Sequence, residues 1–89
     1  FGAESMAEVP IIGELEGQAI SGQIDRLVVK EKEVLILDFK TNKYVPKTVP
    51  QNYQKQLEAY RDLIKNIFPD KIIKSYLLWT ENMTLMEVK

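Results

Sequence analysis

The sequence predicts an α/β fold in which one helix packs on a mixed sheet of about five strands, in the order β-β-β-α-β-β. Three observations support this order. Apolar residues recur every three or four positions in residues 51–67, as they do in a helix. Runs rich in branched apolar residues, which are typical of strands, lie on both sides of that segment. The connection through the helix is long enough to join two parallel strands, so the sheet is expected to be mixed.

The first three strands are expected before the helix. Residues 8–16 alternate loosely between apolar and polar side chains, and Gly13 and Gly17 are expected at turn or bulge points. The second and third strands are expected at residues 19–30 and 33–40. The connection between them is short enough for a tight hairpin.

The register of this hairpin places two carboxylates opposite each other. If Glu31 and Lys32 form the turn, Asp25 faces Asp38 across the two strands. The same register opposes apolar residues in the pairs Leu27–Ile36 and Val29–Val34. Both faces of the hairpin are mostly apolar, which predicts a central place in the sheet with cover on both sides.

The helix is expected at residues 51–67. Pro50 suits the first helical position, with Thr48 or Val49 near the cap, and Pro69 follows the end. The predicted apolar stripe of the helix consists of Tyr53, Leu57, Tyr60, Ile64 and Ile67.

Two further strands are expected after the helix. Residues 72–80 are apolar on both faces, which predicts a buried central strand, and residues 84–88 form a short closing strand. One helix covers only one face of the sheet. The other face is therefore expected to pack against an upstream helix, a partner chain or a second copy of the fragment, as a dimer.

Composition bounds the function classes. The chain has 89 residues, which is enough for one small domain, and its 45% hydrophobic and 28% charged residues are ordinary for a soluble globular protein. No apolar run approaches the roughly 18 residues needed to cross a membrane. The absence of cysteine and histidine excludes disulfide scaffolds, thiolate metal sites and imidazole ligands. A net charge of −1 argues against tight autonomous DNA binding.

The opposed carboxylates suggest a metal site. Directly opposed Cβ atoms lie roughly 4.5–5.5 Å apart, so two like charges there are destabilising. A divalent cation removes that conflict, and oxygen ligands suit magnesium or manganese. Lys40 shares a face with Asp38 and is placed to neutralise phosphate charge or orient a water. The alternative is an ordinary Asp38–Lys40 ion pair at a strand end, with Asp25 in an unrelated turn.

Three motifs in chain order resemble the RecB-like branch of the PD-(D/E)XK nucleases. They are Gly22-Gln-Ile-Asp25-Arg26, Ile36-Leu-Asp38-Phe39-Lys40-Thr-Asn42 and Gln56-Leu-Glu-Ala-Tyr60. Within that branch the chain looks most like the C-terminal nuclease domain of AddA, a bacterial helicase–nuclease subunit that processes DNA double-strand breaks. The resemblance implies a restriction-endonuclease-like core. It also implies that residues 1–89 are a single nuclease domain, a C-terminal fragment of a larger protein that lacks the family's upstream helix.

The resemblance implies a role for each matching residue. Asp25 and Asp38 would be catalytic metal ligands, with the backbone carbonyl of Phe39 as a third ligand, and Lys40 would be the catalytic lysine. The implied cofactor is Mg²⁺, with Mn²⁺ as a substitute. The family usually supplies a further acidic or histidine ligand from a helix before the first strand, which this chain is not expected to contain.

Three further residues are expected to support the site. Gln56 and Tyr60 match the family's Gln-x-x-x-Tyr motif, whose side chains help to hold DNA or order the catalytic groups. Glu8 matches a commonly acidic position in an early strand. Gln56 and Tyr60 are four residues apart and therefore share one helix face. The alternative is that Tyr60 is a core aromatic and Gln56 its solvated neighbour.

The resemblance also implies a function and partners. The expected function is a metal-dependent DNA exonuclease or endonuclease in a helicase–nuclease of the bacterial cytoplasm that serves recombinational repair. The expected partners are DNA, a helicase region of the same polypeptide and a second, AddB-like subunit. ATP would act only through that helicase region, because no glycine-rich phosphate-binding loop is present here. The alternatives are a non-catalytic nuclease-like module that holds DNA or a partner subunit, and a plain structural domain.

Basic residues after the lysine motif are open to two interpretations. Lys43, Lys47, Lys55 and Arg61 are placed either along one edge of a DNA path or as solvated surface residues.

Overall fold

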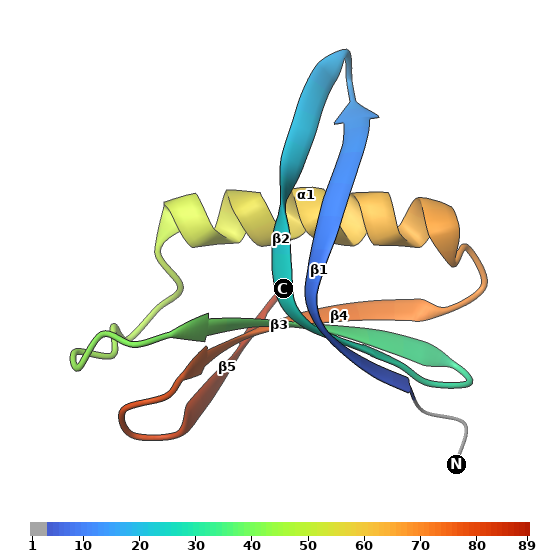
Figure 1. Cartoon of the computed structure of the whole chain (residues 1–89). Coiled ribbons are helices and arrows are strands. Elements are labelled where there is room, and N and C mark those ends of the chain that lie inside the picture. The colour runs from blue at the N-terminus through green and yellow to red at the C-terminus, as the bar shows by residue number, and fades with distance from the viewer. Residues whose placement is uncertain (1–3) are drawn as a thin grey trace.

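A computed structural model describes residues 4–89, and its elements follow the predicted order (Figure 1). They are β1 (Glu4–Leu15), β2 (Gln18–Val29), β3 (Glu33–Lys40), α1 (Gln51–Ile67), β4 (Ile72–Trp79) and β5 (Thr84–Val88). The strands form one sheet in the order β1-β2-β3-β4-β5. The β3–β4 pair is parallel and the other neighbouring pairs are antiparallel, which confirms the mixed sheet. Residues 1–3 of the predicted domain lie outside the described part.

The β2–β3 hairpin has the predicted register. Leu27 pairs with Ile36 and Val29 with Val34. The Lys30 amide donates to the Glu33 carbonyl at 2.8 Å and closes the turn at the predicted place. The ladder between these strands ends at the pair Arg26–Leu37, so the predicted pair Asp25–Asp38 is the next position in this register but is not part of the ladder.

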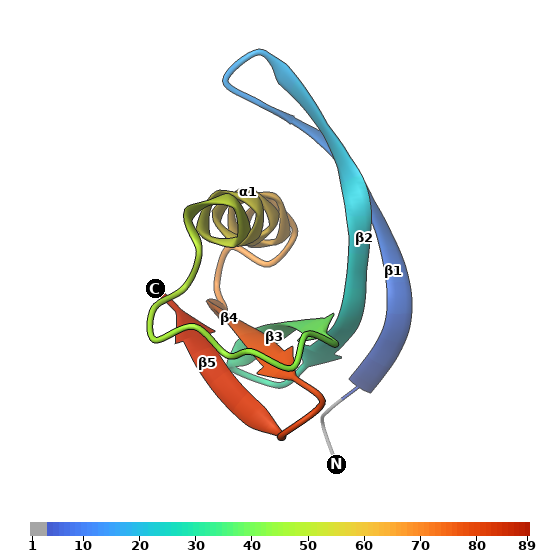
Figure 2. The ribbon, with the colours of Figure 1, turned by 90° about the vertical axis from the view of Figure 1, so that its left-hand side faces the viewer.

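Strand β2 parts from β3 at Asp25. It pairs with β1 from Gln18 onwards but with β3 only over residues 26–29. The β1–β2 hairpin therefore extends beyond β3 and curves around α1 (Figure 2). Ile24 and Leu27 are both buried, although residues three apart in a regular strand point to opposite faces. The strand therefore twists about its own axis between them, and Asp25 lies at that twist.

The core lies between the sheet and α1. Its fully buried side chains come from all the elements except β1: Ile24, Val34, Ile36, Leu57, Ser75, Leu77, Trp79 and Val88. The opposite sheet face is more open, because residues 4–89 contain one helix only; Phe39, for example, is 38% exposed. The prediction that the hairpin is covered on both faces is therefore wrong for the described part of the chain. No helix in residues 4–89 is long and apolar enough to span a membrane.

Helix α1 has the predicted limits, with two local differences. Pro50 is the N-cap and not the first helical residue: its backbone is extended, and its carbonyl accepts the first helical bond from the Gln54 amide at 3.0 Å. Leu63 is buried and Ile67 is exposed, whereas Ile67 was expected in the apolar stripe. Ile67 is the last helical residue, and the helix stops there because Pro69 restricts the preceding Phe68 to extended conformations.

Two glycines allow α1 to lie close to the β1–β2 hairpin. A Cβ atom at Gly13 would lie 2.5 Å from Leu63 Cδ2, and one at Gly22 would collide with the Tyr60 hydroxyl. Gly17 forms the hairpin turn, as predicted, with a positive φ of 80°. Gly13 was expected at a turn or bulge, but it lies within β1, where its missing side chain makes room for Leu63.

Alanine at Gly22 is expected to lower the free energy of unfolding by about 1–3 kcal/mol, because its methyl group overpacks the contact with Tyr60. Tyr60→Phe removes the hydroxyl and should recover part of that loss when the two changes are combined. Urea denaturation of the two single variants and the double variant measures this coupling. Equal losses from Gly22→Ala with and without the Tyr60 hydroxyl would contradict the proposed contact.

Candidate active site

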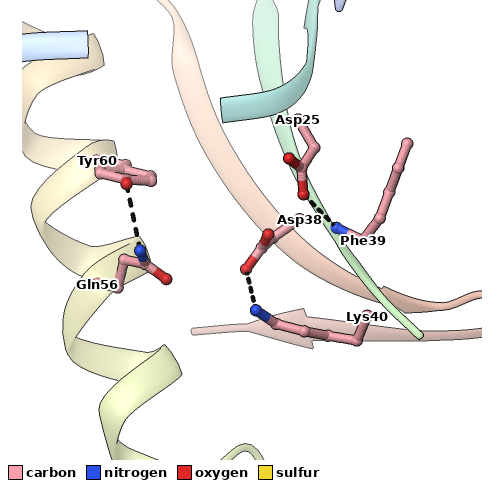
Figure 3. A network of polar contacts seen from close by, with 6 residues as sticks. All are labelled: Asp25, Asp38, Phe39, Lys40, Gln56 and Tyr60. Carbon is pink, nitrogen blue, oxygen red and sulfur yellow. Dashed lines mark hydrogen bonds and ion pairs between the residues drawn. The ribbon is translucent and has the colours of Figure 1, made fainter. Parts of the chain in front are cut away.

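Three side chains from two strands meet where β2 leaves β3. Asp25 comes from the twist in β2, and Asp38 and Lys40 come from the end of β3. Alternation along β3 places Asp38 and Lys40 on one face. In Figure 3 the Asp38 carboxylate lies between the Asp25 carboxylate and the Lys40 ammonium group. The structure therefore brings together the three residues predicted to be catalytic.

The Asp25 carboxylate replaces a missing backbone partner. Its Oδ2 accepts a hydrogen bond of 2.8 Å from the Phe39 amide. In a continued antiparallel ladder a β2 carbonyl would accept that bond, but β2 has already turned away. The N–H and C=O groups of one strand residue point to the same edge, so the Phe39 carbonyl also points toward the Asp25 side.

Asp38 and Lys40 form a largely buried ion pair. Lys40 Nζ lies 2.9 Å from Asp38 Oδ2, and each side chain is 17% exposed. The pair lacks the angles of a hydrogen bond, and no other donor in residues 4–89 satisfies this buried oxygen. Asp38 Oδ2 is therefore a buried oxygen that accepts no hydrogen bond, whereas most buried polar atoms in proteins accept or donate at least one.

The environment raises the pKa of Asp38 above its ordinary value. Burial is the main cause, because it penalises the charged form, and the interaction with the Asp25 side chain raises the pKa further. The nearby Lys40 ammonium group lowers the pKa and only partly offsets these effects. Without a further positive charge, Lys40 therefore does not fully offset the effect of burial and of Asp25 on the pKa of Asp38.

Aromatic side chains hold Lys40 from the helix side. Lys40 Nζ lies 3.9 Å from the centre of the Tyr53 ring, a cation–π contact. Tyr53 packs at a tilt of 59° on the buried Trp79, with 6.5 Å between the ring centres, and Trp79 Nε1 donates to Met86 Sδ at 3.1 Å. Sequence reasoning placed Tyr53 in the apolar stripe and missed this contact. The available signal was its position one helical turn before Gln56.

Gln56 and Tyr60 form a hydrogen-bonded pair on α1. Gln56 Nε2 donates to the Tyr60 hydroxyl at 3.2 Å, and both side chains extend toward the side of the sheet that carries Asp38 (Figure 3). Tyr60 is buried and Gln56 is exposed. Tyr60 is thus a core residue whose hydroxyl group reaches Gly22. Its place in the core is compatible with a supporting role for its hydroxyl group in the site.

The other predicted residues do not join this cluster. Glu8 is exposed on β1, at a backbone φ of 52°, between the pairs Ala7–Arg26 and Val9–Ile24. It therefore lies opposite Asp25 in the β1–β2 register, but its side chain does not form a cluster of three acidic ligands with the aspartates. Arg61 donates to the Val88 carbonyl at 2.7 Å and so ties α1 to β5. Lys55 lines a groove with three acidic residues, Glu16, Glu58 and Asp62. Lys43 and Lys47 are exposed in the loop after β3.

The donor atoms fit a hard divalent cation. Two carboxylates and one backbone carbonyl offer oxygen ligands alone, and the unsatisfied Asp38 Oδ2 lies among them. Magnesium is commonly bound by one or two carboxylates together with waters and substrate phosphates. No group of three or more acidic, histidine or cysteine side chains that could bind a metal occurs in residues 4–89. The protein would therefore provide only part of the coordination shell.

Comparisons with known proteins agree with this geometry. The family model described as the PD-(D/E)XK nuclease superfamily matches residues 2–84. A search of curated proteins finds no match. Among solved structures, the crystal structure of a protein called SSO0001 is similar, with a TM-score of 0.62 and 17% sequence identity over 96% of this chain. At this identity the likeness concerns the fold alone, and the chain spans 41% of that protein's chain.

The raised pKa of Asp38 predicts how the stability of the metal-free protein depends on pH. Well below the ordinary aspartate pKa, Asp38 is protonated in both the folded and the unfolded chain and contributes nothing. As the pH rises, the unfolded chain releases its proton first, so this group lowers the free energy of unfolding until the pH passes the raised folded-state pKa. Asp38→Asn, which cannot ionise, should therefore be more stable than the parent at neutral pH.

Urea denaturation in the presence of a chelator, at neutral and at acid pH, measures this difference. It should vanish as the pH falls below the ordinary aspartate pKa. Asp62→Asn, at an exposed position on α1, is the matched control for loss of an aspartate charge. A parent protein that is more stable than Asp38→Asn at neutral pH would contradict the assignment.

Proposed function

The chain belongs to the PD-(D/E)XK nuclease superfamily, and on this premise we propose that Asp25, Asp38 and Lys40 form a metal-dependent site that hydrolyses phosphodiester bonds in DNA. The observation that carries the proposal is the meeting of two carboxylates and one lysine in a largely buried place. Folding alone gains little from that arrangement, because like charges are brought together and partly desolvated there. Phosphoryl chemistry uses each of the three groups.

Asp25, Asp38 and the Phe39 carbonyl would hold the divalent cation. When bound, magnesium polarises phosphoryl oxygens and lowers the pKa of a coordinated water. The hydrogen bond from the Phe39 amide to Asp25 Oδ2 orients the Asp25 carboxylate, so the position of its other oxygen is fixed as well. Orientation of this kind keeps ligands in place before substrate arrives.

Lys40 would stabilise the negative charge that develops on the phosphate. Its ammonium group is fixed on two sides, by the Asp38 carboxylate and by the Tyr53 ring. A preorganised positive charge in a place of limited solvent access acts more strongly on a transition state than one in water. The Gln56–Tyr60 pair would order the helix side of the site and contact the DNA backbone through the exposed Gln56 amide.

We further propose that this site works as the nuclease module of a larger bacterial helicase–nuclease of the AddA type. The likeness of the Asp25-Arg26 and Asp38-Phe39-Lys40-Thr41-Asn42 segments to AddA supports this proposal. A net charge of −1 also fits a module that receives its DNA strand from elsewhere, because autonomous DNA binding normally uses a basic surface. The helicase region would use ATP in the cytoplasm, and an AddB-like subunit would be its partner.

One observation favours the second candidate, a non-catalytic module that holds DNA or a partner subunit. In the part of the chain that the structure describes, no third acidic side chain joins the aspartate pair. Against it, both carboxylates and the lysine are retained in contact, whereas a module that only holds DNA does not need them. DNA binding without metal-dependent hydrolysis would distinguish this candidate from the enzyme.

Asp38→Ala and Lys40→Ala are each expected to lower the rate of DNA hydrolysis by about 100-fold or more, because each removes charge from the reacting phosphate or its cation. Cleavage of linear DNA with Mg²⁺ or Mn²⁺ measures the rate, in this chain and in any longer polypeptide that carries it. Lys32→Ala, which truncates an exposed lysine in the β2–β3 turn, is the matched control and should retain the parent rate. Full activity in Asp38→Ala and Lys40→Ala would refute the proposal.

A further inference from the structure

A pocket of about 240 Å³ lies between the loop after β3 and the start of α1. Its aromatic walls are Tyr44 from the loop, Tyr53 from α1 and Trp79 from β4. Two loop prolines complete the apolar lining, and Asn42 and Asn52 provide amide groups. None of its lining residues is charged, although charged residues are frequent in this chain.

The lining indicates the chemistry of a ligand. A phosphate or sugar-phosphate group would require cationic or clustered N–H donors, which the lining residues do not supply. Flat aromatic ligands stack on tyrosine rings such as Tyr44 and Tyr53, and side-chain amides offer both a donor and an acceptor for the edge of a heterocycle. An apolar cavity of about 150 Å³ holds benzene, so this pocket has room for a larger ring system. The nucleobase is the ligand class that fits these features.

The pocket shares a wall with the active site. Tyr53 lines the pocket, and its ring also carries Lys40 Nζ at 3.9 Å from the ring centre. Trp79 supports Tyr53 and lines the pocket as well. A ring bound in the pocket would therefore contact the same tyrosine that holds Lys40. That juxtaposition suits a base and a phosphate of the same DNA strand.

We propose that this pocket binds an unpaired nucleobase of the DNA strand on which Lys40 acts. The inference rests on the proposed nuclease function. Bases within a duplex are already stacked and paired, and they reach an aromatic pocket only after they leave the stack. Tyr44, which is 75% exposed, is available to stack on the incoming base, and Tyr53 lies on the wall shared with Lys40.

Binding, rather than cleavage, tests this pocket, so that a failure here is distinct from a failure of the nuclease proposal. The probes are a labelled thymidine oligonucleotide and an abasic oligonucleotide of equal length, which carries the same phosphates without bases. Fluorescence anisotropy in the presence of a chelator measures both affinities. The protein should prefer the thymidine oligonucleotide by roughly 5- to 150-fold, the effect of stacking one base on an aromatic side chain.

Tyr44→Ala should remove most of this preference, and Tyr44→Phe, which keeps the ring, should retain it. Because Tyr44 is exposed, the truncation should leave the melting temperature unchanged, and a melting curve checks this. A preference for bases that is lost in Tyr44→Ala supports the pocket, even in a protein that cleaves nothing. Equal binding of both oligonucleotides, binding of neither, or a preference that Tyr44→Ala leaves intact overturns it. Metal-dependent cleavage observed together with such a result would leave the nuclease proposal standing.

Discussion

The hydrogen bond from the Phe39 amide to the Asp25 carboxylate is the interaction on which this site depends. Strand β2 leaves β3 at that point to follow the hairpin around α1, and a carboxylate takes the place of the lost backbone acceptor. The same departure brings the Asp25 side chain to Asp38. The curvature of the hairpin and the position of Asp25 therefore have the same origin. If β2 continued straight, its backbone would pair with Phe39 and the aspartate would not be needed as an acceptor.

Bringing these charged groups together lowers the stability of the folded protein alone. Burial and the Asp25 side chain raise the pKa of Asp38, and Lys40 only partly compensates. Asp38 Oδ2 is buried and lacks a donor in hydrogen-bond geometry within residues 4–89. Groups held in such an environment are frequent at functional sites. The aromatic contacts of Lys40 belong to the same arrangement, because Tyr53 and Trp79 fix the lysine from the helix side without adding charge.

Sequence patterns predicted the elements and the register but not the local twist. Branched apolar residues at regular positions placed the strands and paired Leu27 with Ile36. Ile24 and Leu27 are both apolar and fit a strand on either face, so nothing in the pattern showed that both are buried. The contact between Tyr53 and Lys40 joins α1 to β3 and depends on the tertiary fold. Asp25, Asp38 and Lys40 meet in space, the Gln56–Tyr60 pair lies on α1, and Glu8 lies opposite Asp25 in the register without joining a cluster of three acidic ligands.

Calorimetric titration with Mn²⁺ and Mg²⁺ tests the central claim most directly, namely that the paired aspartates bind a divalent cation. We expect the cations to bind the parent chain and Asp62→Asn, which removes an exposed carboxylate on α1, and not to bind Asp38→Ala. The parent should also gain thermal stability from the cation, because a ligand that binds only the folded state stabilises it. Binding that persists in Asp38→Ala, or an absence of binding to the parent, would contradict the account.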